Sequence, residues 1–397
     1  MSGATEAAAR PVVVDADTHL TEVHDLWTSR APPEIKERVP KVVDQDGIPT
    51  WVVDGSVLAR ATGGGVVAID GSKGPPAEAC LEWPIEAMHA AAYDPVARLE
   101  LMDDQGIAVQ VVFPNTVGFG GDILSNTVND PELRLACLQL YNDFGAELQR
   151  DTKERLLSMA VLPAWDVGAS VRETLRGHDM GLRGVNMTMD PQDQGGPDLA
   201  SPDWDPLWEV VSDLALPVHF HIGASATTMA FFGDFAWPSQ DRDVAVAVGS
   251  ALLFQNNARV VSNICCSGLL DRFPALQFVS VESGAGWVPF ALLAIDFEMQ
   301  ENAPERLAEL SMMPSAYVKR NFTMTFWFEP LTPGGFGHWI GEDNLMFATD
   351  FPHPTCLFPD PVEVAMANTA ALSPEGRAKV LGGNAARLYR LDLPTID

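Results

Sequence analysis

The sequence predicts a (β/α)8 TIM barrel, in which a closed ring of eight parallel strands is covered by helices, with an insertion after the first strand. Three observations favour this class. Eight short, β-rich apolar runs end at polar or small residues, helix-compatible stretches separate them, and no glycine-rich nucleotide-binding turn follows any run. An open, doubly wound parallel sheet is the alternative, and it normally carries such a turn.

The eight predicted strands follow one another along nearly the whole chain. Each combines apolar or β-branched residues with a polar or small residue at its end, which is typical of a strand buried in a parallel sheet. In order, they are Pro11–His19, Val109–Thr116, Leu156–Pro163, Leu182–Thr188, Leu216–Gly223, Leu276–Ser283, Thr323–Pro330 and Asn344–His353.

Amphipathic stretches lie between the predicted strands. Asp94–Gly106, Asp130–Arg150 and Asp203–Leu214 repeat apolar residues at three- and four-residue spacing, which predicts helices with one buried face. Buried strands that alternate with such helices form a parallel sheet covered by helices, and eight repeats favour closure into a barrel. We therefore treat residues 1–397 as a single barrel domain.

Residues 25–92 do not fit this repeat and are predicted to be an insertion. Asp46–Gly55 has the pattern of a hairpin, Gly63–Gly65 that of a flexible linker, and a Pro/Gly-rich stretch runs around Gly71–Pro76. An insertion after the first strand lies at the C-terminal face of a barrel, where active sites are built. It is therefore expected to form a lid or a subunit contact.

The composition narrows the partners and the compartment. A formal net charge of −29, from 54 acidic against 25 basic residues, repels phosphate backbones and anionic headgroups, so we expect no nucleic-acid or membrane partner. The N-terminus lacks a secretory-signal pattern, and the five cysteines are odd in number without CxxC spacing. We expect a cytoplasmic protein with reduced thiols.

Residues able to bind a metal stand at the ends of four predicted strands. They are Asp17 and His19 at the first strand, His219 and His221 at the fifth, Glu282 at the sixth, and Asp350 with His353 at the eighth. In a barrel these ends converge on one mouth. Imidazole nitrogen with carboxylate oxygen is a ligand set for Zn, Mn or Fe(II). Any one of them alone could be a core histidine or a turn cap, but their common position predicts one or two divalent metal ions per chain.

Aromatic residues in loops or at strand ends suggest the kind of substrate. Each could simply belong to the core, but even a few of them at the mouth would favour a bulky, apolar small molecule. The candidate pocket residues are Trp51, Phe232, Trp237, Trp287 and Trp327.

Four sequence motifs together resemble the amidohydrolase superfamily. They are DADTH at the first strand, LPVHFHIG at the fifth, VESGAGWVP at the sixth and ATDFPHP at the eighth, and the similarity extends from Pro11 to Leu391. The most similar branch is that of aminocarboxymuconate-semialdehyde decarboxylase and the bacterial "amidohydrolase 2" proteins. The resemblance implies a metal-dependent enzyme and a homodimer formed partly by the insertion.

The resemblance also implies roles for individual residues. Asp17 and His19 match the paired first-strand ligands, and His221 matches the fifth-strand ligand. Asp350 matches an aspartate that contacts the metal and accepts a proton from metal-bound water. His219 would then lie behind the ligands and orient one of them.

Two positions depart from the family pattern. The fourth strand ends near Asn186 instead of the lysine whose carbamate bridges two metals in the dinuclear hydrolases. Glu282 stands where the decarboxylases carry a catalytic histidine, so it is a general base, an extra metal ligand, or only a support for the loop at Gly284 and Gly286. Glu22, just past the first strand, could add another carboxylate ligand. Such a carboxylate-rich set suits Fe(II), Mn(II) or a dinuclear centre.

These residues lead to three hypotheses. The leading one is a metal-dependent hydrolase or nonoxidative decarboxylase of a bulky, largely apolar carbonyl or carboxylate substrate, with Asp350, Glu282 and His353 as catalytic residues. The second is a nonheme iron or diiron monooxygenase on the same barrel, with Glu282 as an added ligand. The third is a catalytically silent barrel that only binds ligands, which the complete ligand set disfavours.

Overall fold

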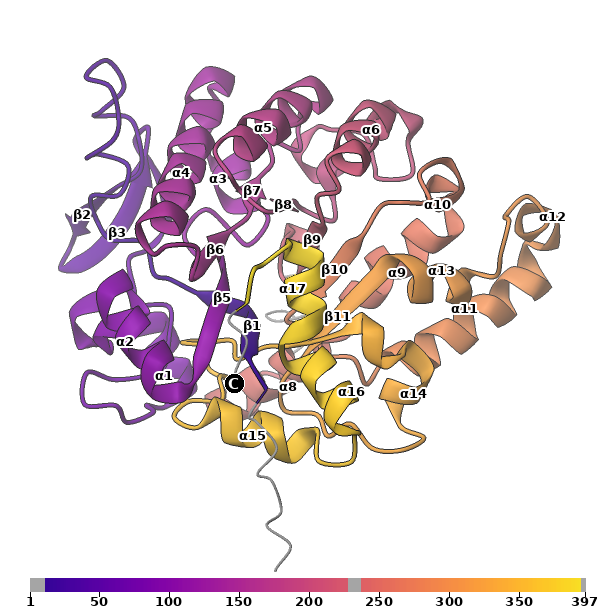
Figure 1. The fold of residues 1–397 in the computed structure, drawn as a ribbon. Helices are drawn as coiled ribbons and strands as arrows, with labels where there is room; N and C mark the ends of the chain where they lie inside the picture. The colour runs from indigo at the N-terminus through magenta and orange to yellow at the C-terminus, as the bar shows by residue number, and fades with distance from the viewer. Residues whose placement is uncertain (1–10, 228–236, 394–397) are drawn as a thin grey trace, which may run out of the picture.

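The chain forms a ring of parallel strands inside a layer of helices, as the computed structural model shows for residues 11–227 and 237–393 (Figure 1). The predicted TIM-barrel class is therefore confirmed, and every one of the eight predicted runs overlaps a strand. The strands are β1 (Val13–His19), β5 (Ile107–Phe113), β6 (Leu156–Ser158) continued by β7 (Ala160–Val161), β8 (Val185–Asn186), β9 (Val218–His221), β10 (Phe278–Val281), β11 (Phe322–Phe326) and β12 (Leu345–Phe347).

Two joints connect the parallel sheets β1-β5-β6 and β7-β8-β9-β10-β11-β12 into one ring. At the first joint, β6 and β7 belong to one extended segment that is interrupted at Met159. At the second, Thr18 pairs with Phe351 in a parallel bridge, and the Asp350 N–H donates to the Asp17 carbonyl at 2.9 Å. We call this second joint, between the end of β1 and the residues after β12, the seam.

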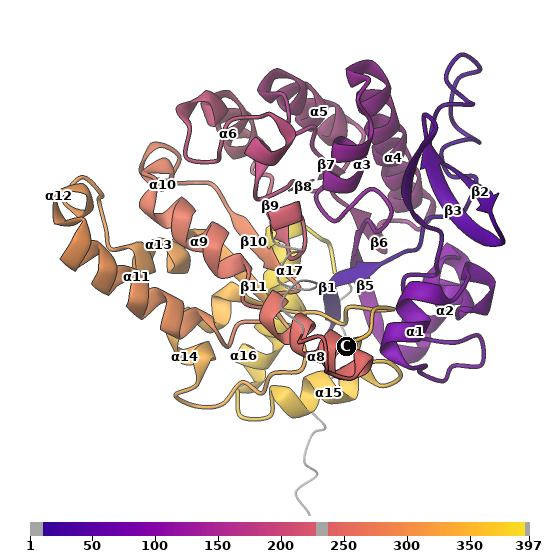
Figure 2. The same ribbon diagram turned by 180° about the vertical axis from the view of Figure 1, so that it is seen from behind.

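Helices surround the strands in both views (Figures 1 and 2). The helix expected at 94–106 is α2 (Pro95–Gln105), which begins at the Asp94 side-chain cap and ends at Gly106 with φ +76°. The other helices are α1 (Pro76–Glu82), α3 (Asp122–Thr127), α4 (Pro131–Asp151), α5 (Val167–Asp179), α6 (Asp205–Asp213), α8 (Arg242–Leu253), α9 (Asn257–Cys266), α10 (Leu269–Arg272), α11 (Val288–Asn302), α12 (Pro304–Leu307), α13 (Pro314–Asn321), α14 (Phe336–Ile340), α15 (Pro361–Asn368), α16 (Pro374–Ala378) and α17 (Asn384–Tyr389).

Side chains along the strands alternate between two apolar layers, apart from a shift in β1. On β9, Phe220 packs in the outer layer, between the strands and the helices. His219 and His221 on the same strand point into the ring, where Val281 of β10 belongs to the inner layer. The inner layer fills the ring, so polar side chains near the strand ends are presented at its mouth.

The insertion contains a three-stranded antiparallel sheet, which differs from the single hairpin expected. Residues 46–55 form one strand, β3 (Ile48–Val53), between two Asp-Gly turns with positive φ. β2 (Lys41–Gln45) and β4 (Ser56–Arg60) pair with its two edges. The two Asp-Gly turns therefore belong to two successive hairpins, and the sheet lies beside α4 (Figure 2).

The glycine run in the insertion is closely packed, so the prediction of a flexible linker at Gly63–Gly65 was wrong. A Cβ on Gly63 would collide with Met88, and one on Gly65 would lie 2.7 Å from the Pro352 carbonyl oxygen. The Val66 N–H donates to that same carbonyl at 2.9 Å. Because the site has no room for a side chain, glycine lets the insertion contact the loop after β12.

One stretch, Arg242–Cys266, has the length and apolar composition of a membrane span. In the structure it consists of two helices, α8 and α9, and 33% of its most apolar window is buried. Val260, Val261 and Ile264 of α9 pack into the core of the barrel. Since a core helix passes the same test, this stretch is weak evidence for a membrane.

Candidate metal centre

A β-bulge in β1 aims two of the predicted metal ligands into the ring. Between Asp15 and Thr18, three steps along β1 match two steps along β5. The extra residue shifts the alternation of side chains by one position, so Ala16 and Asp17 both face the interior. The predicted alternation of Asp17 and His19 holds beyond this bulge.

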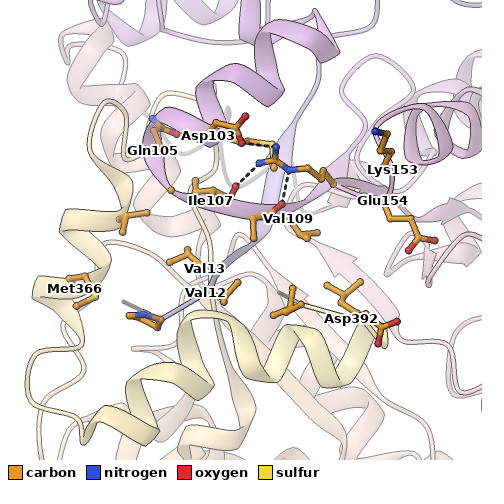
Figure 3. Close-up of a pocket in the computed structure, with 18 residues that line it drawn as sticks. Val12, Val13, Asp103, Gln105, Ile107, Val109, Lys153, Glu154, Met366 and Asp392 are labelled. Carbon is orange, nitrogen blue, oxygen red and sulfur yellow. Dashed lines mark hydrogen bonds and ion pairs between the residues drawn. The ribbon is translucent and has the colours of Figure 1, made fainter. Parts of the chain in front are cut away.

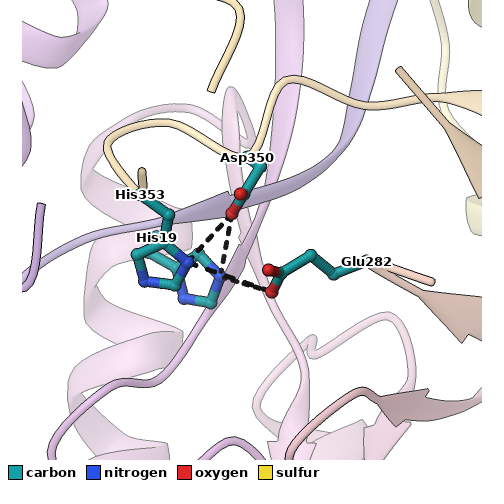
Figure 4. Close-up of side chains that lie close together, drawn as sticks. All are labelled: His19, Glu282, Asp350 and His353. Carbon is teal, nitrogen blue, oxygen red and sulfur yellow. Dashed lines mark ion pairs between the residues drawn. The ribbon is translucent and has the colours of Figure 1, made fainter. Parts of the chain in front are cut away.

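Six side chains with potential ligand atoms meet at the mouth of the barrel. Within each of two overlapping groups, the ligand atoms lie within 4.8 Å of one another; the groups are His19, Glu282, Asp350 and His353 (Figure 4), and Asp17, His19 and His221. The shared member is His19, whose Nε2 lies 3.8 Å from both Asp17 Oδ1 and Asp350 Oδ1. His221 Nε2 lies 3.1 Å from Glu282 Oε2. We call these six residues the ligand cluster.

His353 is held by groups on both sides of its ring. Its Nδ1 lies 2.9 Å from Asp350 Oδ1, and its Nε2 lies 2.9 Å from Asn115 Oδ1. Its ring stacks on that of His19, with centroids 3.7 Å apart. The Thr355 hydroxyl donates to the other Asp350 oxygen at 2.8 Å. The sequence analysis placed His353 among the catalytic residues. The structure also places its ring close enough to His19, Glu282 and Asp350 to bind a metal with them.

Two acidic residues of the ligand cluster have a left-handed backbone conformation. Glu282 has φ +53° and Asp350 has φ +56°, each shortly after its strand. This conformation costs a non-glycine residue on the order of 1 kcal/mol. Hydrogen bonds hold it in place: the Glu282 N–H donates to Thr325 Oγ1 at 3.0 Å, and the Asp350 N–H donates across the seam.

Burial determines the charge states in the ligand cluster. It lowers the pKa of His221 to about 3 and that of His19 well below its usual range, so both imidazoles are neutral, as metal ligands must be. Burial, followed by the negative charge of Asp350, raises the pKa of Asp17 and of Glu282 well above their usual ranges. A bound cation would relieve this crowding of carboxylates.

Several buried atoms of the ligand cluster have no hydrogen-bond partner in the part of the chain that the structure describes. They include both Asp17 oxygens, whereas Glu282 Oε2 and Asp350 Oδ1 face imidazole nitrogens of the same cluster at 3.1 and 2.9 Å. Unpartnered buried carboxylates are strongly destabilising, which indicates that a group outside the chain completes them. Imidazole with carboxylate, and no thiolate, fits Zn, Mn or Fe(II). The residues present therefore fit a divalent metal.

Two predicted site residues lie outside the ligand cluster. Glu22 was a candidate ligand, but its oxygens accept hydrogen bonds from the Thr116 N–H at 3.1 Å and the Thr116 hydroxyl at 2.9 Å, so it anchors the loop after β5. His219 was expected to orient a ligand. Instead it joins the Val185 carbonyl to the Tyr389 hydroxyl, each at 2.8 Å, inside the barrel.

A cavity of about 310 Å³ opens onto the ligand cluster. Glu282 and His353 form part of its wall. Phe119 forms another part, and its ring stacks on His221 with centroids 4.4 Å apart. Much of the remaining wall is apolar, with Leu81, Ile123, Ile222, Val246, Leu253 and Phe254. A small organic molecule in this space would reach the ligand cluster through an apolar environment.

Among the described residues, none of the aromatic residues predicted to line the pocket lines the cavity beside the ligand cluster. Trp51 packs edge-on against Trp27 in a core formed partly by the insertion, with centroids 5.4 Å apart. Trp327 is buried edge-on to Phe254, which takes the place at the wall. Of the remaining three, Trp287 donates a hydrogen bond from its ring N–H to the Ser283 carbonyl, and Trp237 is 73% exposed. Phe232 lies outside the described residues.

A larger cavity, of about 590 Å³, lies at the other end of the barrel (Figure 3). Its lining includes the starts of β1 and β5, at Val13 and Ile107. Arg155 closes one side by donating to the Ile107 carbonyl at 3.0 Å and pairing with Asp103 at 2.6 Å. No member of the ligand cluster lines this cavity. Barrel enzymes react at the carboxyl ends of their strands, so the smaller cavity is the candidate active site.

Comparison with known proteins identifies the family. The amidohydrolase family model matches residues 14–391, a range that contains the whole ligand cluster. The chain belongs to the amidohydrolase family. The resemblance inferred from the four sequence motifs is thereby confirmed.

Solved structures share the fold of this amidohydrolase. An amidohydrolase from Mycobacterium avium subsp. paratuberculosis aligns at 20% identity with a TM-score of 0.75, over 96% of this chain and 100% of that one. A 5-carboxyvanillate decarboxylase from Sphingomonas paucimobilis aligns at 20% identity with a TM-score of 0.64, over 96% and 100%. A dihydroxybenzoic acid decarboxylase from Polaromonas sp., with bound manganese and 2-nitroresorcinol, aligns at 19% identity with a TM-score of 0.63, over 97% and 98%.

Two buried carboxylates that the sequence did not single out position the ligands of the amidohydrolase. Asp15 accepts hydrogen bonds from the Asp17 N–H at 3.2 Å and from the Thr349 N–H at 2.8 Å, so it links both sides of the seam. Glu329 accepts backbone N–H groups at 2.9 and 2.7 Å from the loop after Glu282. The loop-supporting role that was one alternative for Glu282 therefore falls to Glu329.

Arg98 is a third positioning residue, fully buried behind the ligand cluster. It donates to the His19 carbonyl and the Ala91 carbonyl at 2.6 Å each, and to Thr18 Oγ1 at 3.0 Å. Burial lowers the pKa of Arg98 to about 9, which still leaves a cation at neutral pH. These bonds tie the insertion to the end of β1.

We expect Arg98→Met to lower the free energy of unfolding by about 3 to 5 kcal/mol, because several buried acceptors would lose their donor. Urea denaturation followed by circular dichroism measures this loss. Arg150→Met is the matched control, since Arg150 is 69% exposed and pairs with Asp151 at the surface. An equal, small effect of both substitutions would show that Arg98 does not hold this region together.

Proposed function

We propose that this amidohydrolase is a metal-dependent hydrolase or nonoxidative decarboxylase that acts on a bulky, largely apolar carbonyl or carboxylate substrate. The observation that carries the proposal is the group of buried carboxylates, with both Asp17 oxygens unpartnered, beside neutral imidazoles and next to an apolar cavity. The residues that would hold the ion are Asp17, His19, His221 and Asp350, with Glu282 and His353 within reach. A cytoplasmic location and a homodimeric state stay predictions.

A divalent ion, when bound, polarises a carbonyl or carboxylate oxygen and lowers the pKa of water. The chain itself contributes orientation and proton transfer. Asp350 Oδ1 is the proposed proton acceptor, and its direction is fixed because Thr355 holds the other oxygen. His353 Nδ1, at 2.9 Å from Asp350 Oδ1, is placed to share that proton. The apolar cavity wall keeps water away from these groups, which strengthens their electrostatic interactions.

The names of two similar structures favour the decarboxylase form of the proposal. Dihydroxybenzoic acid decarboxylase and 5-carboxyvanillate decarboxylase are named for aromatic acids, and the first contains bound manganese. A cavity of about 310 Å³ with apolar walls suits one aromatic ring with small substituents. Aromatic carboxylic acids and manganese are therefore the first substrates and the first metal to test.

A nonheme iron or diiron monooxygenase is the second candidate function, and Glu282 is the residue that favours it. Its Oε2 lies 3.1 Å from His221 Nε2 and 3.9 Å from His19 Nε2. It thus adds a third carboxylate to the ligand cluster, whose two overlapping groups offer ligands for two ions. Carboxylates mixed with imidazoles suit Fe(II).

Metal analysis of protein expressed with Zn, Mn and Fe supplied tests both candidates. We expect one Zn or Mn per chain, with release of CO₂ from a hydroxybenzoic acid or hydrolysis of an aryl ester by the loaded protein. Two Fe per chain together with dioxygen consumption would favour the monooxygenase. Absence of any metal would contradict both functions.

Metal analysis of the Glu282→Gln variant distinguishes between two possible roles of Glu282. As a ligand to a second ion, Glu282 is needed for a count of two, and the variant should fall toward one metal per chain. As a general base beside a single ion, it should leave the count at one and remove the acid limb of the pH–rate profile. Glu22→Gln is the matched control, because Glu22 is buried nearby but lies outside both groups, and we expect it to keep the wild-type metal count.

A further inference from the structure

The cavity beside the ligand cluster lacks a cationic side chain. Among the described residues of its wall, the titratable groups are Cys80, Asp122, Glu282 and His353, with no Lys or Arg. Residues 228–236, outside the described part, also contain no Lys or Arg in their sequence. An anionic group on a ligand, away from the metal, would therefore meet apolar walls and a carboxylate without a counter-charge.

Asp122 is the acidic residue of the described wall that does not belong to the ligand cluster. It stands at the start of α3, in the connection after β5, and is 5% exposed. Its Oδ1 accepts a long hydrogen bond of 3.3 Å from the Gly120 N–H. Within residues 11–227 and 237–393, no residue besides Gly120 and Asp122 itself donates a hydrogen bond to this carboxyl group. This nearly buried carboxyl group in the cavity wall can therefore accept a further hydrogen bond.

The turn that carries Asp122 is fixed next to the metal ligands. The Phe119 ring stacks on His221 and lies edge-on to His19, with centroids 4.4 and 5.4 Å apart. Asn186 Nδ2 donates to the Phe119 carbonyl, which ties the turn to the end of β8. Asp122 therefore has a defined position relative to the ligand cluster.

The environment of Asp122 favours a ligand that donates a hydrogen bond. Burial raises the pKa of Asp122 to about 6, because the surroundings disfavour the ionised carboxylate and the backbone N–H groups of Asp122 and Gly120 offset this only in part. A carboxyl oxygen in a cavity wall can accept a hydrogen bond from a ligand in place of one from water, in surroundings that strengthen it. The bond is stronger when the donor is charged.

We infer that Asp122 recognises a hydrogen-bond donor on the substrate, a hydroxyl or a protonated amine, carried by an apolar body whose other end reaches the ligand cluster. The inference rests on the proposed function, since it takes the metal centre as the other anchor. It defines the substrate class as apolar molecules with a neutral or cationic far end. Substrates with a second carboxylate at that end are disfavoured.

Binding of hydroxamate probes to the manganese-loaded protein, measured by calorimetry, separates the two anchors. Four benzohydroxamic acids of similar size carry an aminomethyl, hydroxymethyl, ethyl or carboxyl group opposite the metal-binding hydroxamate. We expect the aminomethyl and hydroxymethyl probes to bind about tenfold more tightly than the ethyl probe, and the carboxyl probe to bind most weakly. Equal affinity of all four would overturn the role of Asp122. Failure of all four to bind loaded protein would overturn the proposed function, and the inference with it.

Asp122→Asn keeps the side-chain size and an oxygen that can accept the Gly120 N–H, but it removes the negative charge. The aminomethyl probe should then lose its advantage over the ethyl probe, while manganese content stays unchanged. Asp122→Leu should make the ethyl probe the tightest of the four. Asp360→Asn, at an exposed aspartate before α15, is the control and should keep the wild-type order. Full retention of the aminomethyl preference in Asp122→Asn would mean that Asp122 only supports the turn.

Discussion

Asp350→Asn is expected to lower kcat by about 10²- to 10⁴-fold while metal content stays close to that of the wild type. The amide keeps the size of the side chain and one oxygen donor for the metal, but it cannot accept a proton. Its neighbours Thr355 and His353 can still hold it in place. Turnover of the aromatic acid or ester that the wild type converts, and metal content of the same preparation, are the two measurements.

Asp360→Asn is the matched control for this substitution. Asp360 lies ten residues further along, is exposed, and makes no side-chain cap hydrogen bond to α15, so neither rate nor metal content should change. A near-normal rate in Asp350→Asn would remove Asp350 from proton transfer. Parallel loss of metal and rate would instead make metal binding its main contribution.

His221→Ala is expected to weaken metal binding by at least about 100-fold and to abolish turnover with it. Loss of a group that merely supports a ligand already weakens metal binding by about 10- to 100-fold, and His221 is proposed to be a ligand itself. Its Nδ1 is bonded to the Ile222 carbonyl at 2.8 Å, which leaves Nε2 facing the ligand cluster. Competition with a chromogenic chelator measures the affinity, and His19→Ala should behave in the same way.

His219→Gln provides the control on the same strand, two residues away. His219 points into the barrel but bonds to the Val185 carbonyl and the Tyr389 hydroxyl, away from the ligand cluster. We expect this variant to lose some stability and to bind metal with wild-type affinity. Full metal occupancy in His221→Ala, or loss of metal in His219→Gln alone, would show that the two histidines had been assigned the wrong roles.

The ring of strands and most of the ligand cluster were predictable because their signals are local. Barrel strands are buried on both faces, so they are recognisable as apolar runs, and each of the eight runs overlaps a strand. Asp17, His221 and Asp350 lie at or near the carboxyl ends of strands, and these ends meet at one mouth of the barrel. Identifying the strands therefore also located the residues most relevant to chemistry.

Features that depend on contacts between distant segments gave no local signal. In the sequence, Arg98 looks like an ordinary helix residue. In the structure it donates hydrogen bonds to the Ala91 and His19 carbonyls, which belong to two other segments. In the sequence, Gly65 looks like part of a flexible run. In the structure the Pro352 carbonyl packs against it. Trp327 follows a strand as expected for a pocket residue, yet Phe254 from another helix end occupies the wall instead. Packing among elements far apart in sequence decided all three.

The seam affects the order in which this chain folds and binds its metal. Thr18 and Phe351, which meet there, are separated by 333 positions in the chain. Asp17 and Asp350, two of the proposed ligands, are joined across the same contact by a backbone hydrogen bond. A cation held by both would bind tightly only after β1 and β12 have come together, and by mass action it would disfavour every state in which they have separated. Metal acquisition would then be among the last events of folding, and partly folded chains would compete poorly for the ion.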